Sequence, residues 1–238
     1  MKTSKKKLPL SNIRVIELTE QGVGPGAGKL LADFGAESIR IESPQRPDGM
    51  RGPIPERQNK SVLFNEFNRN KKGMALNLKE SKNQNVLHEL VSISDLVIEN
   101  FSPGVMGRLA MDYDTISKIN PSIVMVSLSG MGHSGPFGKF AIYGPNLMTW
   151  SGLTHLWNHP DIDFPVGSQT YHPDFFAAIF GAYLALGGLF RRMATGHGCY
   201  IEAPEGEMGA SSLGGFYMQY LKNKQEPQPI GNKSTHMA

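Results

Sequence analysis

Asp174 is the residue of this sequence whose type and position best suit chemistry. It precedes FFAAIFGAYLALGGLF, a run with no charged residue until Arg191. A helix without a polar face cannot lie on a protein surface, so the run is either a short membrane span or a helix buried on all sides. It is shorter than the roughly 18 to 20 residues of a span, and Gly181, Gly187 and Gly188 suit close helix packing. We predict a buried helix with Asp174 at its N-terminus.

Two interpretations of Asp174 stand at this point. Unpaired N–H groups and the helix dipole favour an anion at a helix N-terminus, so the carboxylate can simply cap the helix. Alternatively, it can act as a nucleophile at the end of a dry helix. His172, two residues earlier, could pair with it as an acid or base, although an ordinary loop histidine is the simpler interpretation.

A glycine-rich motif follows the first apolar run. Gly22, Gly24 and Ala27 have the G-x-G-x-x-A order of a dinucleotide-binding loop, and Glu42 ends the next apolar run, where such proteins bind the ribose hydroxyls. Three residues separate the run from the first glycine, and Pro25 interrupts the turn. An NAD-linked enzyme is therefore one hypothesis.

Basic residues lie near two further strand boundaries. Arg69, Lys71 and Lys72 precede the strand-like stretch MALNL, and Arg108 lies on a short helix that Pro103 begins. Cations at strand ends suit phosphate groups, and a solvated turn explains the first cluster equally well.

The elements that must position these residues alternate along the chain. Continuous apolar strands with helices between them predict a parallel α/β sheet. Ligands of such sheets gather outside the carboxyl ends of the strands, so the loops after Leu18, Glu42, Glu99 and Leu128 should face one site. The predicted strands are 13–18, 37–42, 74–78, 95–100, 122–129 and 199–203.

Composition restricts the class of protein. Of the 238 residues, 39% are hydrophobic and 19% charged, which is typical of a soluble globular chain. The net charge of +3 depends on lysines in residues 1–8, an expected disordered tail without the apolar segment of a secretory signal, so nucleic-acid binding has little support. The single cysteine, Cys199, fits a reducing cytoplasm, and the histidines show no metal-site spacing, so we expect no metal and no membrane.

Several segments together resemble the class III CoA-transferases, the CaiB/BaiF-type family. The resemblance extends from Leu8 onward and rests on the order and spacing of all of them. It implies a Rossmann-like parallel sheet flanked by helices, the N-terminal part of the family's large domain. The segments are VIELTEQGVGPGAGKLLADFGAESIRIESP, FNRNKKGMALNLK, DLVIENFSPGVMGRLAMDYDTISKINPSIVMVSLSGMGHSGP, and the small-residue helix with RRMATGHGCYIEA.

The resemblance implies that Asp174 is a nucleophile. In that family the corresponding aspartate attacks an acyl-CoA thioester, giving a mixed anhydride and then an aspartyl-CoA thioester that an acceptor carboxylate attacks. Acyl-CoA and a carboxylic acid would be substrates, with no tightly bound cofactor. The implied CoA contacts are Gln21, Gly22 and Val23 along the pantetheine and nucleotide, Lys71 and Arg108 at the phosphates, Asn100 and Phe101 along the adenine or pantetheine, and Tyr143.

Two positions depart from the family pattern. Ser43 stands where relatives often carry a basic residue, which removes one expected phosphate contact. Gly144 follows Tyr143 where formyl-CoA transferases carry an acidic residue, so formyl and oxalate chemistry is less expected. α-Methylacyl-CoA racemases of the same family use a histidine where this chain has Tyr143, which argues against that alternative.

Family members are longer than this chain and form interlocked dimers. We therefore expect residues 9–204 to be the CoA-binding and catalytic domain, and residues 205–238 to be a helix and linker leading to a domain absent here. A homodimer, or pairing with the missing half, is expected. A non-catalytic CoA-binding fragment is the remaining alternative.

Overall fold

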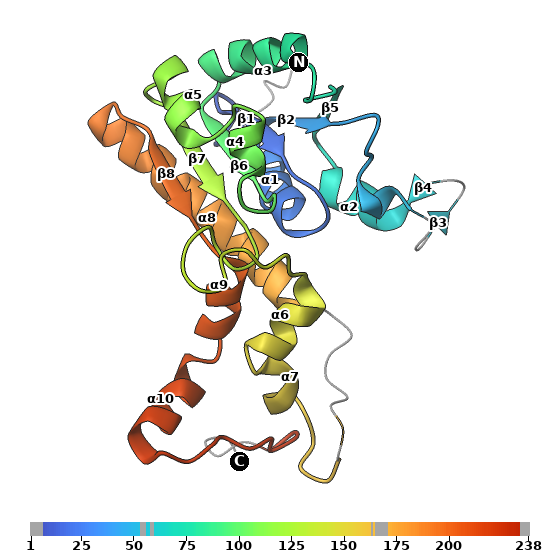
Figure 1. Cartoon of the computed structure of the whole chain (residues 1–238), viewed down its shortest axis with the longest axis vertical. Coiled ribbons are helices and arrows are strands. Elements are labelled where there is room, and N and C mark those ends of the chain that lie inside the picture. Colours follow the sequence, from blue (N-terminus) through green and yellow to red (C-terminus); the bar gives the residue numbers. More distant parts are fainter. Residues whose placement is uncertain (1–6, 53–55, 58–59, 163, 165–170, 234–238) are drawn as a thin grey trace, which may run out of the picture.

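The computed structural model describes residues 7–52, 56–57, 60–162, 164 and 171–233 (Figure 1). Six strands form one sheet in the order β5-β2-β1-β6-β7-β8, and every neighbouring pair is parallel. This is the strand order of a doubly wound Rossmann sheet. Successive strands are added on one side of β1 and then, from β6 onward, on its other side. The predicted parallel α/β sheet is confirmed. The strands are β1 (Arg14–Leu18), β2 (Glu37–Glu42), β5 (Lys72–Ala75), β6 (Leu96–Glu99), β7 (Val124–Ser127) and β8 (Cys199–Glu202).

Successive side chains of a strand point to opposite faces of the sheet. Both faces carry buried apolar residues, and helices cover both. Val15 of β1 belongs to a core cluster with residues of α1 (Val23–Asp33) and α8 (His172–Thr195). The next residue, Ile16, belongs to a second cluster on the other face. The helices of that second face are α3 (Ser81–Ser92), α4 (Val105–Arg108) and α5 (Tyr113–Ile119).

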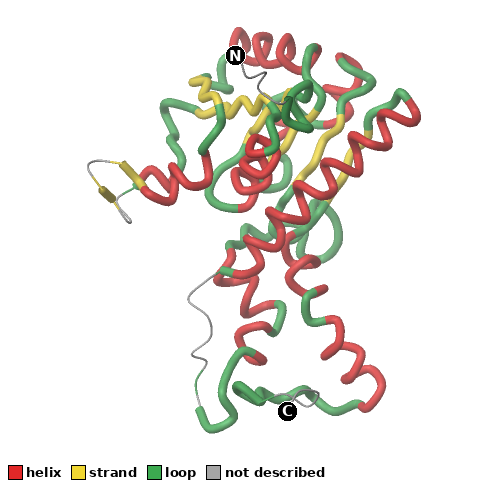
Figure 2. The backbone as a smooth tube through the Cα atoms, turned by 180° about the vertical axis from the view of Figure 1, so that it is seen from behind, coloured by secondary structure: helices red, strands yellow, loops and turns green. Residues whose placement is uncertain are grey.

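Figure 2 shows from behind how α8 crosses the sheet. Small residues on its packed side let it approach the sheet closely. A Cβ atom on Gly181 would lie 2.7 Å from a methyl of Leu128, and one on Gly188 would lie 2.6 Å from Val124. The other side of α8 is apolar and exposed, so the prediction that this helix is buried on all sides is wrong. By length and composition alone, α8 could also cross a membrane. Its large exposed residues are Phe175, Phe176, Ile179, Phe180, Tyr183, Leu186, Phe190 and Met193.

The remaining helices extend below the sheet or flank its edge (Figure 1). Several boundaries differ from the predictions: α1 begins at Val23, β5 covers Lys72–Ala75 and not 74–78, and β7 covers Val124–Ser127 and not 122–129. The single helix expected after Pro204 is broken at Ser212. A two-stranded ribbon, β3 (Glu56–Arg57) and β4 (Lys60–Ser61), precedes α2. The remaining helices are η1 (Gly49–Arg51), α2 (Val62–Asn68), α6 (Gly144–Trp150), α7 (Leu153–Leu156), α9 (Glu205–Ser211) and α10 (Gly214–Asn223).

Candidate active site

A cavity of about 730 Å³ lies outside the carboxyl ends of the strands. Residues of the loops after β1, β2, β6 and β7 line it, so the prediction that these four loops face one site is confirmed. Of the predicted site residues, the cavity brings together Gln21, Gly22, Val23, Asn100, Phe101, Arg108, Tyr143 and Asp174.

Asp174 lies in the first turn of α8, where Tyr171 is the N-cap residue, so the interpretation of Asp174 as the N-cap is wrong. Oδ1 is buried and has no hydrogen-bond partner among the described residues. Burial raises the pKa of Asp174 from 3.8 to about 6. A carboxylate that accepts few hydrogen bonds keeps its electron pairs for a substrate, which suits a nucleophile.

Two glycines lie beside the Asp174 carboxylate, and one of them, Gly144, makes room for it. A Cβ atom on Gly22, at the start of α1, would lie 3.6 Å from Oδ2. One on Gly144, at the start of α6, would overlap the carboxylate. The first turns of α1, α6 and α8 therefore meet at this group, and their leading N–H groups lack intrahelical acceptors.

Asn100 fixes the loop that leads into α1. Its Oδ1 accepts a hydrogen bond from Glu20 N at 2.9 Å, and its Nδ2 donates to Glu20 O at 2.9 Å. These bonds join the loops after β1 and β6, the point at which the strand order reverses. Gln21 follows with a φ of 62°, and its N–H donates to Asp48 Oδ2 at 3.2 Å. Asn100 thus shapes this wall of the cavity through the backbone of Glu20.

The predicted basic cluster does not reach the cavity. Lys71 Nζ lies 2.7 Å from Glu17 Oε2 and also donates to Pro25 O at 2.7 Å. The Lys71 side chain is 2% exposed and that of Glu17 is 0% exposed. Arg69 pairs with Asp33, and Lys72 pairs with Glu37. This arrangement argues against the predicted phosphate contact of Lys71 and indicates a structural ion pair beneath α1.

Glu42 does not support the dinucleotide hypothesis. Its carboxylate accepts two hydrogen bonds from Arg51, each of 2.7 Å, and one from Asp48 N at 2.9 Å. It lines a separate depression of about 340 Å³ rather than the main cavity. These hydrogen bonds hold the loop after β2 in place and occupy the Glu42 carboxylate.

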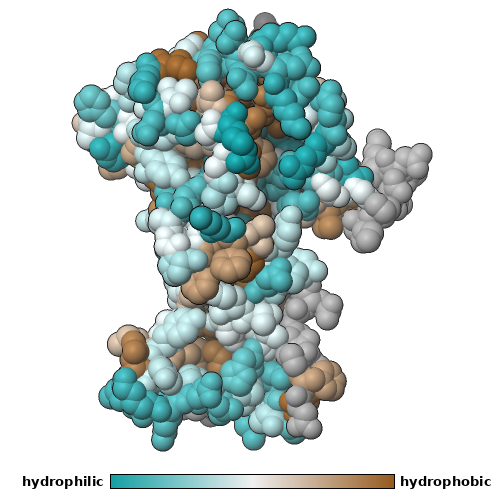
Figure 3. Space-filling model, viewed as in Figure 1, coloured by the Kyte–Doolittle hydropathy of each residue, from teal (hydrophilic) through white to brown (hydrophobic). Residues whose placement is uncertain are grey.

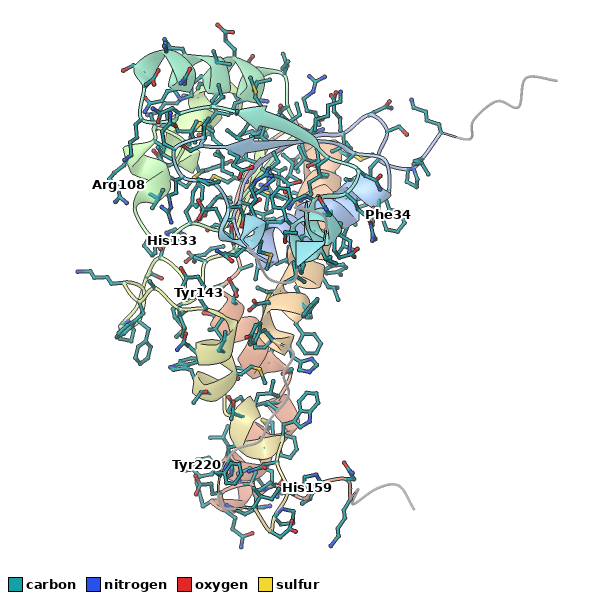
Figure 4. All side chains as sticks on the ribbon, turned by 90° about the vertical axis from the view of Figure 1, so that its right-hand side faces the viewer. Phe34, Arg108, His133, Tyr143, His159 and Tyr220 are labelled. Atoms are coloured by element: carbon teal, nitrogen blue, oxygen red, sulfur yellow. The ribbon has the colours of Figure 1, made fainter. Side chains whose placement is uncertain are left out.

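Three exposed cations line the cavity, and each follows a different strand of the sheet. Arg108 on α4 is exposed and has no ion pair among the described residues. Sequence reasoning missed Arg46 and Lys79, which also line the cavity; the position of Arg46 three residues after Ser43 was the available signal. Figure 4 shows Arg108 and Tyr143 on the same side of the molecule, with His133 between them. A phosphate-bearing ligand would find positive charge here and the carboxylate of Asp174 further in.

The loop that carries Tyr143 contacts the ends of three strands through His133. His133 Nε2 lies 2.8 Å from Ser127 Oγ and 3.7 Å from Glu99 Oε1, and His133 N–H donates to Glu202. The neighbouring Glu99 carboxylate raises the pKa of His133. Phe137 and Phe140, further along this loop, are exposed. Figure 3 shows an apolar patch on the surface between the upper and lower parts of the molecule.

Besides Asp174, the cavity is lined by two carboxyl groups that sequence reasoning missed, Glu20 and Glu205. Glu205 is the more buried of these two. It is 7% exposed and is the first residue of α9, two residues after the predicted last strand. Burial, and then the charge of Asp174, raise the pKa of Glu205 well above its usual range. The available signal was an acidic residue just beyond the carboxyl end of a strand. Among the described residues, no group of three His, Cys, Asp or Glu side chains could hold a metal ion.

Residues 10–238 match the model of CoA-transferase family III. The chain belongs to that family. It is 35% identical over 196 residues to succinyl-CoA:glutarate CoA-transferase of Mus musculus, covering 82% of this chain and 44% of the relative. It is 32% identical to acetyl-CoA:oxalate CoA-transferase of Acetobacter aceti, covering 99% and 60%. The chain thus spans about half the length of these curated relatives of CoA-transferase family III.

A solved structure agrees with this family assignment. The crystal structure of a CaiB/BaiF family protein from Brucella suis matches with a TM-score of 0.91 and 28% identity, covering 98% of this chain and 62% of that chain. The predicted Rossmann-like fold of a CoA-transferase family III member is therefore confirmed.

Proposed function

We propose that the protein transfers CoA from an acyl-CoA thioester to a free carboxylic acid, with Asp174 as the nucleophile. One observation carries the proposal: the half-buried Asp174 lines the same cavity as the exposed cations Arg46, Lys79 and Arg108. Membership of CoA-transferase family III supports it, since relatives are named for succinyl-CoA and acetyl-CoA donors.

The first half-reaction has two steps, and each step forms one bond and breaks another. An oxygen of Asp174 attacks the thioester carbonyl carbon, the C–S bond breaks, and CoA leaves as a thiolate with the electron pair. The thiolate then attacks the aspartyl carbonyl of the resulting anhydride, so the donor acid leaves as a carboxylate and Asp174 carries CoA as a thioester. Covalent catalysis divides one difficult exchange into easier steps.

The second half-reaction repeats these steps in reverse with the acceptor. Its carboxylate attacks the aspartyl thioester and expels the thiolate, which then attacks the acyl carbonyl of the new anhydride. The products are a new acyl-CoA and the free Asp174 carboxylate. Leading N–H groups of the converging helices could stabilise the oxyanion formed in each addition.

Trapping Asp174 tests the proposal. The protein is incubated with succinyl-CoA or acetyl-CoA and hydroxylamine, then compared with Asp174→Ala by intact-mass and peptide mass spectrometry. A hydroxamate at Asp174 that the variant lacks supports acyl transfer. CoA binding without an adduct would instead favour a non-catalytic CoA-binding protein, and exchange of an α-proton of the acyl group would favour a racemase.

A further inference from the structure

Glu205 is held rigidly at the edge of the cavity by backbone contacts. Its N–H donates to Ser129 O at 3.0 Å, and the next N–H, of Gly206, donates to Gly130 O at 2.9 Å. A Cβ atom on Gly206 would lie 2.9 Å from Met131 Sδ, so the chain passes closely here. These contacts fix the backbone of Glu205 beside the loop after β7.

The carboxyl group has no salt bridge or side-chain hydrogen bond among the described residues, although it is more than nine-tenths buried. Asp174 on α8 lines the same cavity. The other titratable or charged groups on the elements around α9 are His172, Tyr183, Arg191 and Arg192 on α8, Cys199, Tyr200 and Glu202 on β8, Glu207 on α9, and His133, Lys139 and Tyr143 on the loop after β7; α6 carries none. Glu20 lines the same cavity.

Two carboxylates in one desolvated site cannot both carry a charge at low cost, so one of them keeps a proton. Glu205 is the more deeply buried of the two, and its pKa is raised by burial and by the charge of Asp174. The proton therefore resides on Glu205 while Asp174 ionises first. A neutral carboxylic acid has an O–H to donate, which a carboxylate lacks.

We propose that Glu205 binds the free carboxylic acid substrate, donating its O–H to the substrate's carboxylate beside Asp174. This inference rests on the proposed function, because that reaction requires a carboxylate to enter next to an anionic aspartate. The hydrogen bond offsets the repulsion between the two anions and orients the entering oxygen. An ionised residue at this position would repel the substrate instead.

Two matched substitutions separate hydrogen bonding from shape. Glu205→Gln keeps the size and an N–H donor, whereas Glu205→Leu keeps the bulk and removes the donor. Glu207→Gln, on the exposed side of the same helix, is the control for loss of a glutamate. The readouts at pH 7 are the Kd of succinate, used as the probe acid, and the Kd of CoA, each by calorimetry.

We expect Glu205→Leu to raise the Kd of succinate at least tenfold, Glu205→Gln to stay within threefold of the wild type, and CoA binding to change little in either. The carboxyl resonance of Glu205 in protein with ¹³C-labelled glutamate, assigned by its loss in Glu205→Gln, should report a protonated group at pH 7. It should titrate at lower pH in Asp174→Asn.

Three outcomes would overturn the inference: an ionised Glu205 at pH 7, succinate binding that Glu205→Leu leaves unchanged, or no saturable succinate binding by the wild type. The NMR measurement decides the matter even if Glu205→Leu does not fold. A hydroxamate at Asp174 together with any of these outcomes would refute the role of Glu205 alone. Absence of that hydroxamate would refute the proposed function.

Discussion

Gly144 lies so close to the Asp174 carboxylate that a Cβ atom on it would come within 2.8 Å of both Cγ and Oδ2 of Asp174. The residue at position 144 therefore decides how much space the carboxylate has at the start of α6. An acidic side chain at this position would need a different arrangement of this turn.

Replacing Gly144 should disable the nucleophile. In Gly144→Ala the added methyl displaces the carboxylate, so we expect the rate of hydroxamate formation at Asp174 to fall at least tenfold while CoA still binds. A misplacement of about 1 Å can cost on the order of a hundredfold in rate. Gly107→Ala is the control, because nothing lies within 4 Å of its Cβ position. An unchanged rate in Gly144→Ala would contradict the geometry.

Arg108 should contribute to CoA binding through its charge. Arg108→Ala removes an exposed cation of the cavity, so we expect the Kd of CoA to rise about three- to tenfold, with a smaller effect at high salt because exposed charges are screened. The measurement is calorimetry at two salt concentrations. Arg191→Ala, at the far end of α8, removes the same charge away from the cavity and should leave the Kd unchanged.

Lys71 should matter for stability and not for CoA binding. Lys71→Met leaves the buried Glu17 carboxylate without its cation, which costs about 3 to 5 kcal/mol of unfolding free energy. Lys72→Met breaks an exposed pair with Glu37 and should cost under about 1 kcal/mol. Urea denaturation measures both. If folded Lys71→Met loses CoA affinity while its stability is unchanged, the sequence-based phosphate role is right.

Asp174 should destabilise the protein at neutral pH. Its pKa is raised on folding, so its favourable contribution exists below pH 3.8 and is lost as the pH rises through about 6. Asp174→Asn should therefore be more stable than the wild type at pH 7.5, by up to about 3 kcal/mol, and similar to it near pH 4. Denaturation across this pH range tests the sign.

Two glycines on α8 should respond oppositely to alanine. Gly181→Ala adds a methyl against Leu128, so we expect a loss of about 1 to 3 kcal/mol. Gly187 faces open space, so Gly187→Ala should gain about 0.5 to 1 kcal/mol from the higher helix propensity of alanine. Thermal and urea unfolding of the two variants would reveal the difference. Equal effects would mean that α8 does not pack as described.

The sequence was most informative where local patterns decide the structure. The continuous apolar strands predicted the sheet, and the rule for its carboxyl ends gathered the loops around Asp174. Lys71 was misplaced because its partner, Glu17, lies 54 residues earlier, and an ion pair at that separation leaves no local pattern. Glu205 was missed because its burial depends on Ser129 and Gly130, which only the folded chain brings to it.

The outer side of α8 shows a different limit. Small residues form one side of the helix and large apolar residues the other, so both sides are apolar and hydrophobicity alone could not tell the packed side from the exposed one. Only contacts of Gly181 and Gly188 with the sheet identify the packed side.

The bare side of α8 also governs how the isolated chain behaves in solution. Side chains such as Phe180, Tyr183 and Phe190, each more than two-fifths exposed, form an exposed apolar surface along the helix. We expect this surface to bind apolar dyes. We also expect molecules of the protein to associate through it, so that light scattering rises with protein concentration. Since these side chains face away from the sheet, glutamate or lysine at those positions should improve solubility while the sheet and the cavity keep their shape.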